Sequence, residues 1–63
     1  MTTGEKLKEL RGDRNQGEVA KALFISDSAL SAYENDIRVP RDDVKKRIAE
    51  YYGLSVQDIF FIN

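Results

Sequence analysis

Residues 16–35 read QGEVAKALFISDSALSAYEN, and this stretch decides the fold. Apolar residues recur there at helical spacing in two groups, which are Val19, Ala20 and Leu23, and then Leu30 and Tyr33. Only Phe24 and Ile25 separate the first group from Ser26, a residue type that commonly caps the start of a helix. The stretch therefore predicts two helices joined by a tight turn, and the small Ala20 lets the second helix cross the first closely.

The outward face of the second of these helices carries only short side chains. They are Asp27, Ser28, Ser31 and Ala32, whereas most exposed helices carry Lys, Glu, Arg or Gln. A helix with such a face can approach a partner surface closely, because no long side chain holds the two apart. On composition alone, an ordinary solvated helix remains the alternative interpretation of this face.

Helix signals also occur on both sides of this stretch. A first helix over about residues 3–12 ends at Gly12, and Asn15 caps the next helix with Glu18 as its capping-box partner. Pro40 closes a loop before a helix that begins near Asp42.

The last part of the chain follows the same pattern. Gly53 ends the fourth helix, and the pair Ser55 and Asp58 opens a short fifth helix that runs through Phe60. The alternation typical of strands is absent from the sequence. We therefore expect an all-α bundle of five short helices in a single domain, residues 1–63.

The composition excludes most enzyme classes. The chain has no cysteine and no histidine, so disulfides, imidazole-based catalysis and most metal sites are ruled out, and no glycine-rich phosphate loop is present. No apolar run is long enough for a membrane span. We expect a binding module inside the cell, without cofactor, metal or an evident small-molecule site. The balance of 10 basic against 11 acidic residues argues mildly against a nucleic-acid partner.

The sequence resembles a known family of regulators. The residues that carry the resemblance are Gln16–Leu23, Ile25-Ser26, Leu30–Asn35 and Pro40, flanked by Leu7–Arg11 and Ile48–Val56. Together they are similar to the Cro/CI-type, or Xre-like, helix-turn-helix domain of phage repressors and small bacterial transcriptional regulators. The resemblance implies a compact five-helix, lambda-repressor-like fold with the helix-turn-helix in its second and third helices.

The resemblance also implies a DNA interface. In this family the third helix enters the major groove, so Asp27, Ser28, Ser31 and Ala32 become the candidates that read bases. The candidates that contact phosphates are Gln16, Asn35, Arg38 and Arg41. By contrast, we interpret the patch Lys45-Lys46-Arg47 as an ordinary solvated surface. The expected partner is a double-stranded operator, bound by a homodimer in the bacterial cytoplasm.

Two further expectations come from the resemblance. Arg11 and Glu34 should form a structural ion pair that fixes the recognition helix. Phe24 stands where the family generally has a glycine in a left-handed conformation, so either the turn differs locally or Phe24 packing offsets the strain.

The C-terminal run Ile59-Phe60-Phe61-Ile62 has more apolar residues than one helix face can bury. Phe61 and Ile62 are therefore candidates for a dimer interface, with folding onto the core as the alternative. A repressor is the expected function. The rival is a protein-interaction or antitoxin-like module with the same fold, which the acidic balance and Asp27 favour.

Overall fold

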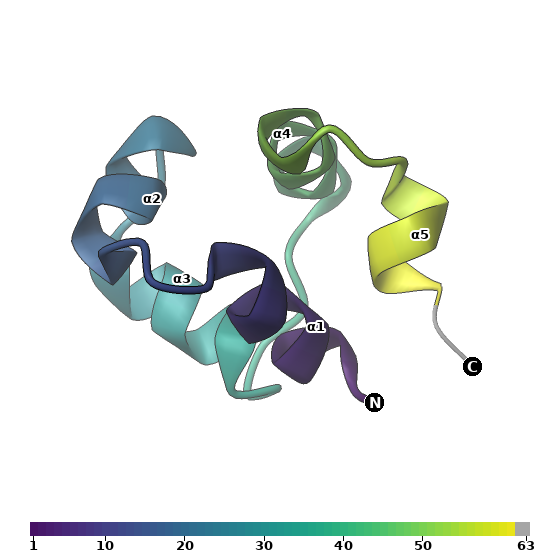
Figure 1. Ribbon diagram of the computed structural model, residues 1–63, viewed down its shortest axis with the longest axis horizontal. Helices are drawn as coiled ribbons and strands as arrows, with labels where there is room; N and C mark the ends of the chain where they lie inside the picture. The colour runs from purple at the N-terminus through teal and green to yellow at the C-terminus, as the bar shows by residue number, and fades with distance from the viewer. Residues whose placement is uncertain (62–63) are drawn as a thin grey trace.

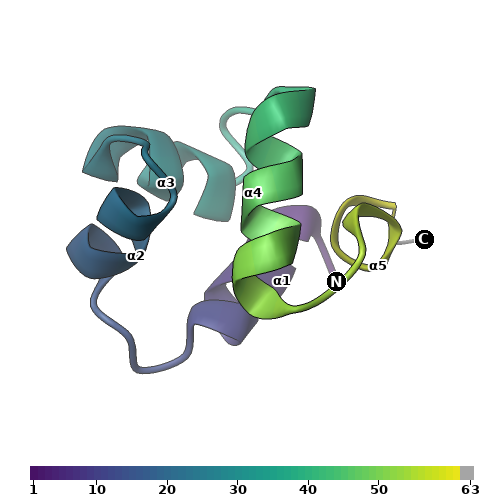
Figure 2. The ribbon, with the colours of Figure 1, turned by 90° about the horizontal axis from the view of Figure 1, so that it is seen from above.

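The computed structural model describes residues 1–61 and contains α-helices only over that range. In chain order they are α1 (Thr3–Arg11), α2 (Gln16–Ala22), α3 (Asp27–Glu34), α4 (Asp42–Tyr52) and α5 (Val56–Phe60). Figures 1 and 2 show α4 standing between the α2–α3 pair and α5, with α1 lying against α3. The predicted all-α fold with five helices is confirmed.

Local capping explains where most of these helices start and stop. Ser55 and Asp58 form the predicted capping box at α5, and Gly53 ends α4 in a left-handed conformation at φ 68°. The Asn15 side chain accepts hydrogen bonds from the N–H groups of Gly17 and Glu18. The reciprocal bond, in which the Glu18 carboxylate accepts from the Asn15 N–H, is not among the hydrogen bonds of residues 1–61, so only half of the predicted capping box forms there.

The core draws on all five helices. Its buried apolar side chains are Leu7, Val19, Ala20, Leu23, Leu30, Tyr33, Val44, Ile48, Ala49 and Ile59. Ala20 is completely buried where α2 packs against α3, as the small residue at this crossing predicts. The apolar side chains within the stretch 16–35 thus hold α2 and α3 at a fixed angle and leave the opposite face of α3 exposed.

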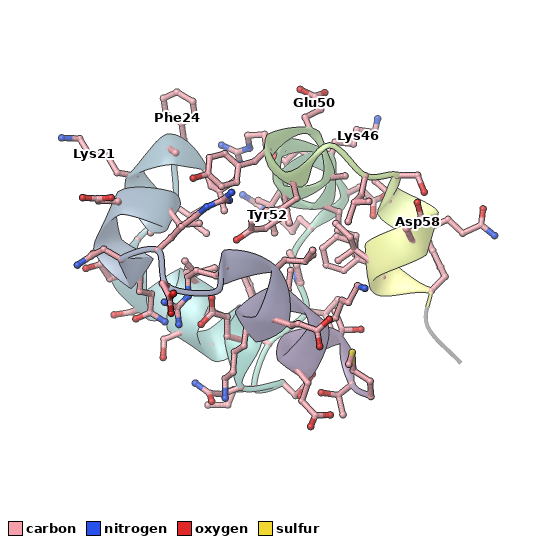
Figure 3. The ribbon with its side chains drawn as sticks, viewed as in Figure 1. Lys21, Phe24, Lys46, Glu50, Tyr52 and Asp58 are labelled. Atoms are coloured by element: carbon pink, nitrogen blue, oxygen red, sulfur yellow. The ribbon has the colours of Figure 1, made fainter. Side chains whose placement is uncertain are left out.

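The turn between α2 and α3 keeps the backbone conformation of a glycine without having one. Phe24 has φ 59°, in the left-handed region that disfavours bulky side chains. Its side chain is 81% exposed and points away from the chain (Figure 3). Neither of the two expected explanations therefore holds, because the turn keeps the left-handed angle and the exposed ring contacts little of the core.

Hydrogen bonds join the start of α1 to the loop after α3. We call this contact, which Thr2, Gly4 and Asp36 form, the polar lock. The Asp36 carboxylate accepts hydrogen bonds from the Gly4 N–H at 2.9 Å and from the Thr2 hydroxyl at 2.6 Å. These bonds lower the pKa of Asp36, the Thr2 hydroxyl contributing most. Because Thr2 also caps α1, with Glu5 completing the capping box, the lock fixes α1 against the end of α3.

Candidate nucleic-acid interface

The helix α3 presents the expected short side chains on its free face. Asp27 and Ser28 are exposed, whereas Ser31 and Ala32 are half-buried. The opposite face of the helix carries Leu30, which is buried in the core. The first turn of α3 is therefore the part of the helix that is most accessible from outside.

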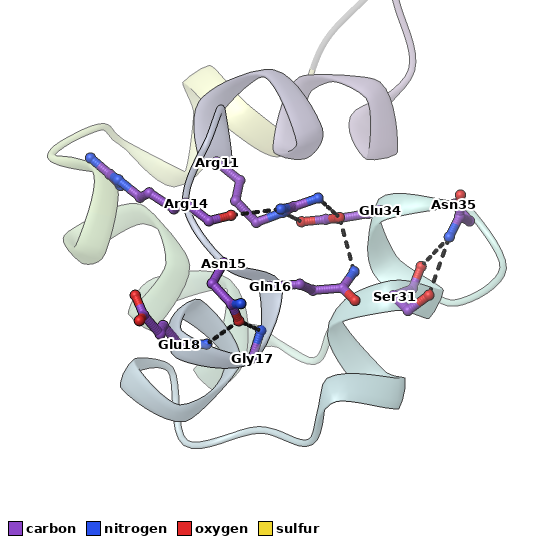
Figure 4. A network of polar contacts seen from close by, with 9 residues as sticks. All are labelled: Arg11, Arg14, Asn15, Gln16, Gly17, Glu18, Ser31, Glu34 and Asn35. Atoms are coloured by element: carbon purple, nitrogen blue, oxygen red, sulfur yellow. Dashed lines mark hydrogen bonds and ion pairs between the residues drawn. The ribbon is translucent and has the colours of Figure 1, made fainter.

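Ser31 is held by a second candidate residue. The Asn35 amide nitrogen donates to the Ser31 carbonyl oxygen at 2.8 Å and to the Ser31 hydroxyl oxygen at 3.3 Å (Figure 4). The hydroxyl oxygen thus uses one of its two acceptor positions, and its O–H remains able to donate. The same bonds commit the Asn35 amide group to α3 instead of the surrounding solvent.

The loop after α3 is fastened to that helix through Ala32. The Ala32 carbonyl oxygen accepts from the N–H groups of Ile37 at 2.9 Å and Arg38 at 3.3 Å. Arg38 and Arg41 are both exposed, and neither side chain makes an ion pair within residues 1–61. Both guanidinium groups are therefore without an ion pair in the described residues, and its backbone bond to Ala32 places Arg38 beside the C-terminal half of α3.

A buried carboxylate connects α1, α2 and α3. Glu34 is 2% exposed, and its oxygens accept from Arg11 Nε at 2.8 Å and from Arg11 Nη2 at 3.1 Å. Gln16 Nε2 donates to the same carboxylate at 3.2 Å, as Figure 4 shows. The hydrogen bond to Glu34 raises the pKa of Arg11 further above its ordinary range. The carboxylate is thereby satisfied by three donors from two other helices.

This network sets how the phosphate candidate Gln16 is oriented. Gln16 is the first residue of α2, and one of its two amide hydrogens is directed inward to Glu34. The second amide hydrogen and the backbone N–H remain for a ligand outside. The N–H groups of Gly17 and Glu18, which a bare helix start would also offer, are occupied by Asn15.

Asp27 lies beside the same helix start. A methyl group placed on Gly17 would lie 3.4 Å from Asp27 Oδ2, so the carboxylate borders the N-terminus of α2. The positive end of a helix stabilises a negative group at this position. The side chain of Asp27 therefore puts negative charge beside the start of α2, next to Gln16.

Helices α2 and α3 are thus joined by a tight turn, and one face of α3 is exposed. The sequence model of the helix-turn-helix family matches residues 7–59, which is most of the chain. The chain belongs to the helix-turn-helix family. This membership confirms the resemblance and the expected lambda-repressor-like fold, and it agrees with the expectation of a binding module in place of an enzyme.

A curated protein is also similar to this chain. The chain is 29% identical over 56 residues to the "Cryptic phage CTXphi transcriptional repressor RstR" of Vibrio cholerae, covering 86% of this chain and 50% of that protein. The chain thus spans about half the length of the curated relative it matches. No solved structure gives a significant match.

Some positions of this helix-turn-helix domain were not identified from the sequence. The contact from Gln16 to Glu34 and the lock formed by Asp36 join residues that are far apart in the chain. Gly4 was a usable signal for the lock, since a glycine within a helix often marks a close approach of backbones. In the described part of the chain, no group of acidic side chains is arranged to hold a metal ion, and no helix has the length and apolar character of a membrane span.

Proposed function

We propose that this protein is a sequence-specific, DNA-binding transcriptional repressor that acts in the bacterial cytoplasm on the nucleoid. It places α3 in the major groove of an operator, and two copies bind one two-fold symmetric site. The observation that carries the proposal is the exposed short-chain face of α3, followed in the chain by Arg38 and Arg41, which are exposed and make no ion pair within residues 1–61. Membership of the helix-turn-helix family and the relative that is named a transcriptional repressor support it.

Base reading is assigned to the free face of α3. Ser28 has an exposed hydroxyl that can donate or accept, and Ser31 is assigned as a donor, since its oxygen already accepts one hydrogen bond from Asn35. The Ala32 methyl suits contact with a thymine methyl, and the Asp27 carboxylate suits the amino group of cytosine. Ser31 therefore selects base edges with acceptors, such as guanine O6 or N7.

Phosphate contacts are assigned to Gln16, Arg38, Arg41 and Asn35. Gln16 uses its outer amide hydrogen, while Arg38 and Arg41 supply charge on the other side of α3. Asn35 contacts a phosphate only after releasing Ser31, so its share of the affinity is the smallest of the four. Because Asp27 repels phosphates next to Gln16, affinity per copy is modest and binding by two copies compensates for it.

For the homodimer, the exposed apolar surface at the C-terminal end is the candidate. Phe61 is 66% exposed, which supports an interface role for it. Phe60 packs against the core. Ile62, the other residue expected at this interface, lies outside the described residues.

The first experiment is selection of bound fragments from random duplex DNA. A recovered site with two-fold symmetry supports both sequence-specific binding and two copies per site. Failure to bind any duplex at low salt would contradict the proposal and favour the protein-interaction or antitoxin-like alternative, for which Asp27 and the net charge of -1 speak.

The second experiment separates the two groups of contacts. Gln16→Ala and Arg38→Ala should weaken binding to the operator and to unrelated DNA alike. Arg38→Ala should also lower the salt dependence of the affinity by the equivalent of about one phosphate contact. Ser28→Ala and Ala32→Ser should instead change which site the selection recovers. Equal effects of both groups on every duplex would contradict the assignment of the α3 face.

A further inference from the structure

A cavity of about 180 Å³ lies on the side of the domain where the loop after α3 meets α1, α4 and α5. Its apolar walls are Tyr33, Val39, Pro40 and Phe60. Tyr33 and Pro40 are buried, whereas Val39 is largely exposed, so the cavity opens to solvent beside the loop. A cavity of about 150 Å³ accommodates one benzene ring, which sets the size of a ligand here to a single ring or short chain.

Two cationic side chains border this cavity. The side chain of Lys45 is only 18% exposed, and its Nζ lies 5.6 Å from the centre of the Phe60 ring. Its ion pair with Asp42 spans 4.0 Å to a carboxylate that is almost fully exposed, so water screens most of the attraction. The interpretation of Lys45 as part of a solvated surface is therefore wrong, because its stem is covered by the walls of the cavity.

Arg38 is the second cation, and within residues 1–61 its side chain has no hydrogen bond or ion pair. Asp36 also lines the cavity and opposes an anion. Its two oxygens accept from Gly4 and Thr2, which ties this carboxylate to α1 but leaves its negative charge in place. Among the lining side chains, the two positive charges of Lys45 and Arg38 still exceed the single negative charge of Asp36. The balance of charge at the mouth of the cavity is positive.

We propose that this cavity binds a small carboxylate that carries one ring or a short apolar chain. The apolar part lies against Phe60 and Pro40, and the carboxylate lies between Lys45 and Arg38. Charge-assisted hydrogen bonds to both cations fix its orientation. A neutral molecule of the same shape gains the apolar contacts only.

Occupation of the cavity also has a consequence for DNA, which rests on the proposed function. Arg38 is among the residues that we assign to phosphate contacts, and one guanidinium group pairs poorly with a ligand carboxylate and a phosphate at once. A bound carboxylate therefore weakens duplex binding. The site would then be an effector site of the repressor.

The test uses benzoate as the probe and benzamide as its neutral match, each titrated against the whole chain by NMR. Benzoate should shift the backbone amide signals of residues 36–45 in a saturable manner, with about tenfold tighter binding than benzamide. Lys45→Met should weaken benzoate about tenfold, and so should Arg38→Gln, whose exposed side chain is not needed for folding.

The matched control is Lys46→Met, which removes the same charge from the outer side of α4 (Figure 3). It should leave benzoate binding unchanged. Equal binding of benzoate and benzamide, signals spread over the surface without saturation, or equal losses in Lys46→Met and Lys45→Met would each overturn the proposal.

A second titration measures duplex affinity at constant ionic strength, with and without saturating benzoate. The effector role is supported if benzoate weakens duplex binding by the original protein but not by Arg38→Gln. An unchanged affinity overturns that role. If benzoate binds as described while no duplex is bound, the cavity site is supported and the proposed function is the statement that fails.

Discussion

Gly4 in α1 lies directly against the backbone carbonyl of Glu34 at the end of α3, and a side-chain methyl group on Gly4 would overlap that oxygen. The Asp36 carboxylate accepts the N–H of the same glycine. The backbone of α1 thus touches the end of the proposed recognition helix without any intervening side chain. Anything that separates these two helices also changes how α3 is presented.

Gly4→Ala should destabilise the domain by about 1–3 kcal/mol through overpacking, because a backbone oxygen cannot rotate out of the way. The higher helix propensity of alanine offsets at most about 1 kcal/mol of this loss. Urea unfolding followed by circular dichroism measures the difference. A variant as stable as the original protein would show that α1 moves freely relative to α3.

Asp36 should make the stability of the domain depend on pH. Its pKa is held below the ordinary value of 3.8 in the folded state, chiefly by the hydrogen bond from Thr2 and then by that from Gly4. A lowered pKa in the fold means that the stabilisation is present above the ordinary pKa and disappears as pH falls through the folded value. Asp36→Asn should therefore lose less stability than the original protein between pH 5 and very acidic solution, as read from thermal midpoints across that range.

The control for this pH series is Asp13→Asn. Asp13 is exposed, and its side chain makes no hydrogen bond in the described part of the chain. If acidification lowers the thermal midpoint less in Asp36→Asn than in Asp13→Asn, the pH dependence of stability is assigned to the polar lock. Parallel curves for the two variants would contradict that assignment.

Arg11→Met should destabilise the domain by about 3 kcal/mol, the lower end of the range for a buried pair that loses one partner. The lower end applies because Gln16 still donates to the Glu34 carboxylate. Arg14→Met is the matched control: its guanidinium lies over the rings of Tyr51 and Tyr52 at the surface, so its loss should cost about 1 kcal/mol or less. Chemical unfolding of both variants measures the difference, and equal losses would contradict a special role for the buried pair.

Phe24→Gly should raise stability by up to about 1 kcal/mol. Relief of the left-handed strain is worth about 1–2 kcal/mol, while the extra freedom of glycine in the unfolded chain takes back roughly 0.5–1 kcal/mol. Phe24→Ala keeps the strain and removes only an exposed ring, so it should match the original protein. Thermal unfolding of the three proteins gives the order, and an alanine variant as stable as the glycine variant would assign the effect to the ring.

Asp27→Asn should tighten binding to every duplex by a few-fold at low salt, and the gain should shrink as salt screens the charge. The reason is the position of the carboxylate beside the start of α2, near Gln16. Glu50→Gln removes an equal charge from the exposed side of α4 (Figure 3) and should have a smaller effect. Titrations with labelled duplexes at two salt concentrations measure both, and identical gains would mean that only net charge matters.

The sequence was sufficient for features that depend on neighbouring residues. Ser55 and Gly53 marked helix ends because capping acts within one turn, and Leu30 and Tyr33 marked the core because helical spacing repeats every three or four residues. These local signals gave the number of helices and the free face of α3. The boundary at Arg11 is one residue short of the expected helix, with Gly12 as its cap.

One kind of feature that the sequence did not predict is a contact between residues far apart in the chain. The bonds from Asp36 to Thr2 and Gly4 cross more than thirty positions of the chain, and no periodic pattern encodes them. The exposed ring of Phe24 was missed for a different reason, since its backbone angle follows from the turn but its side-chain environment follows from tertiary packing. The partly covered Lys45 likewise depends on where the loop after α3 returns.

The anchoring of α3 has a consequence for how specificity changes among relatives of this domain. Its inner face and its last turn are fixed by the core, by Glu34 and by the loop bonds to Ala32, whereas Asp27 and Ser28 are exposed and take no part in the core. Exchanging those two outer side chains alters the chemistry offered to a duplex while leaving the scaffold intact. Under the proposed function, one such framework can therefore acquire a new operator preference through very few mutations, without first having to regain its stability.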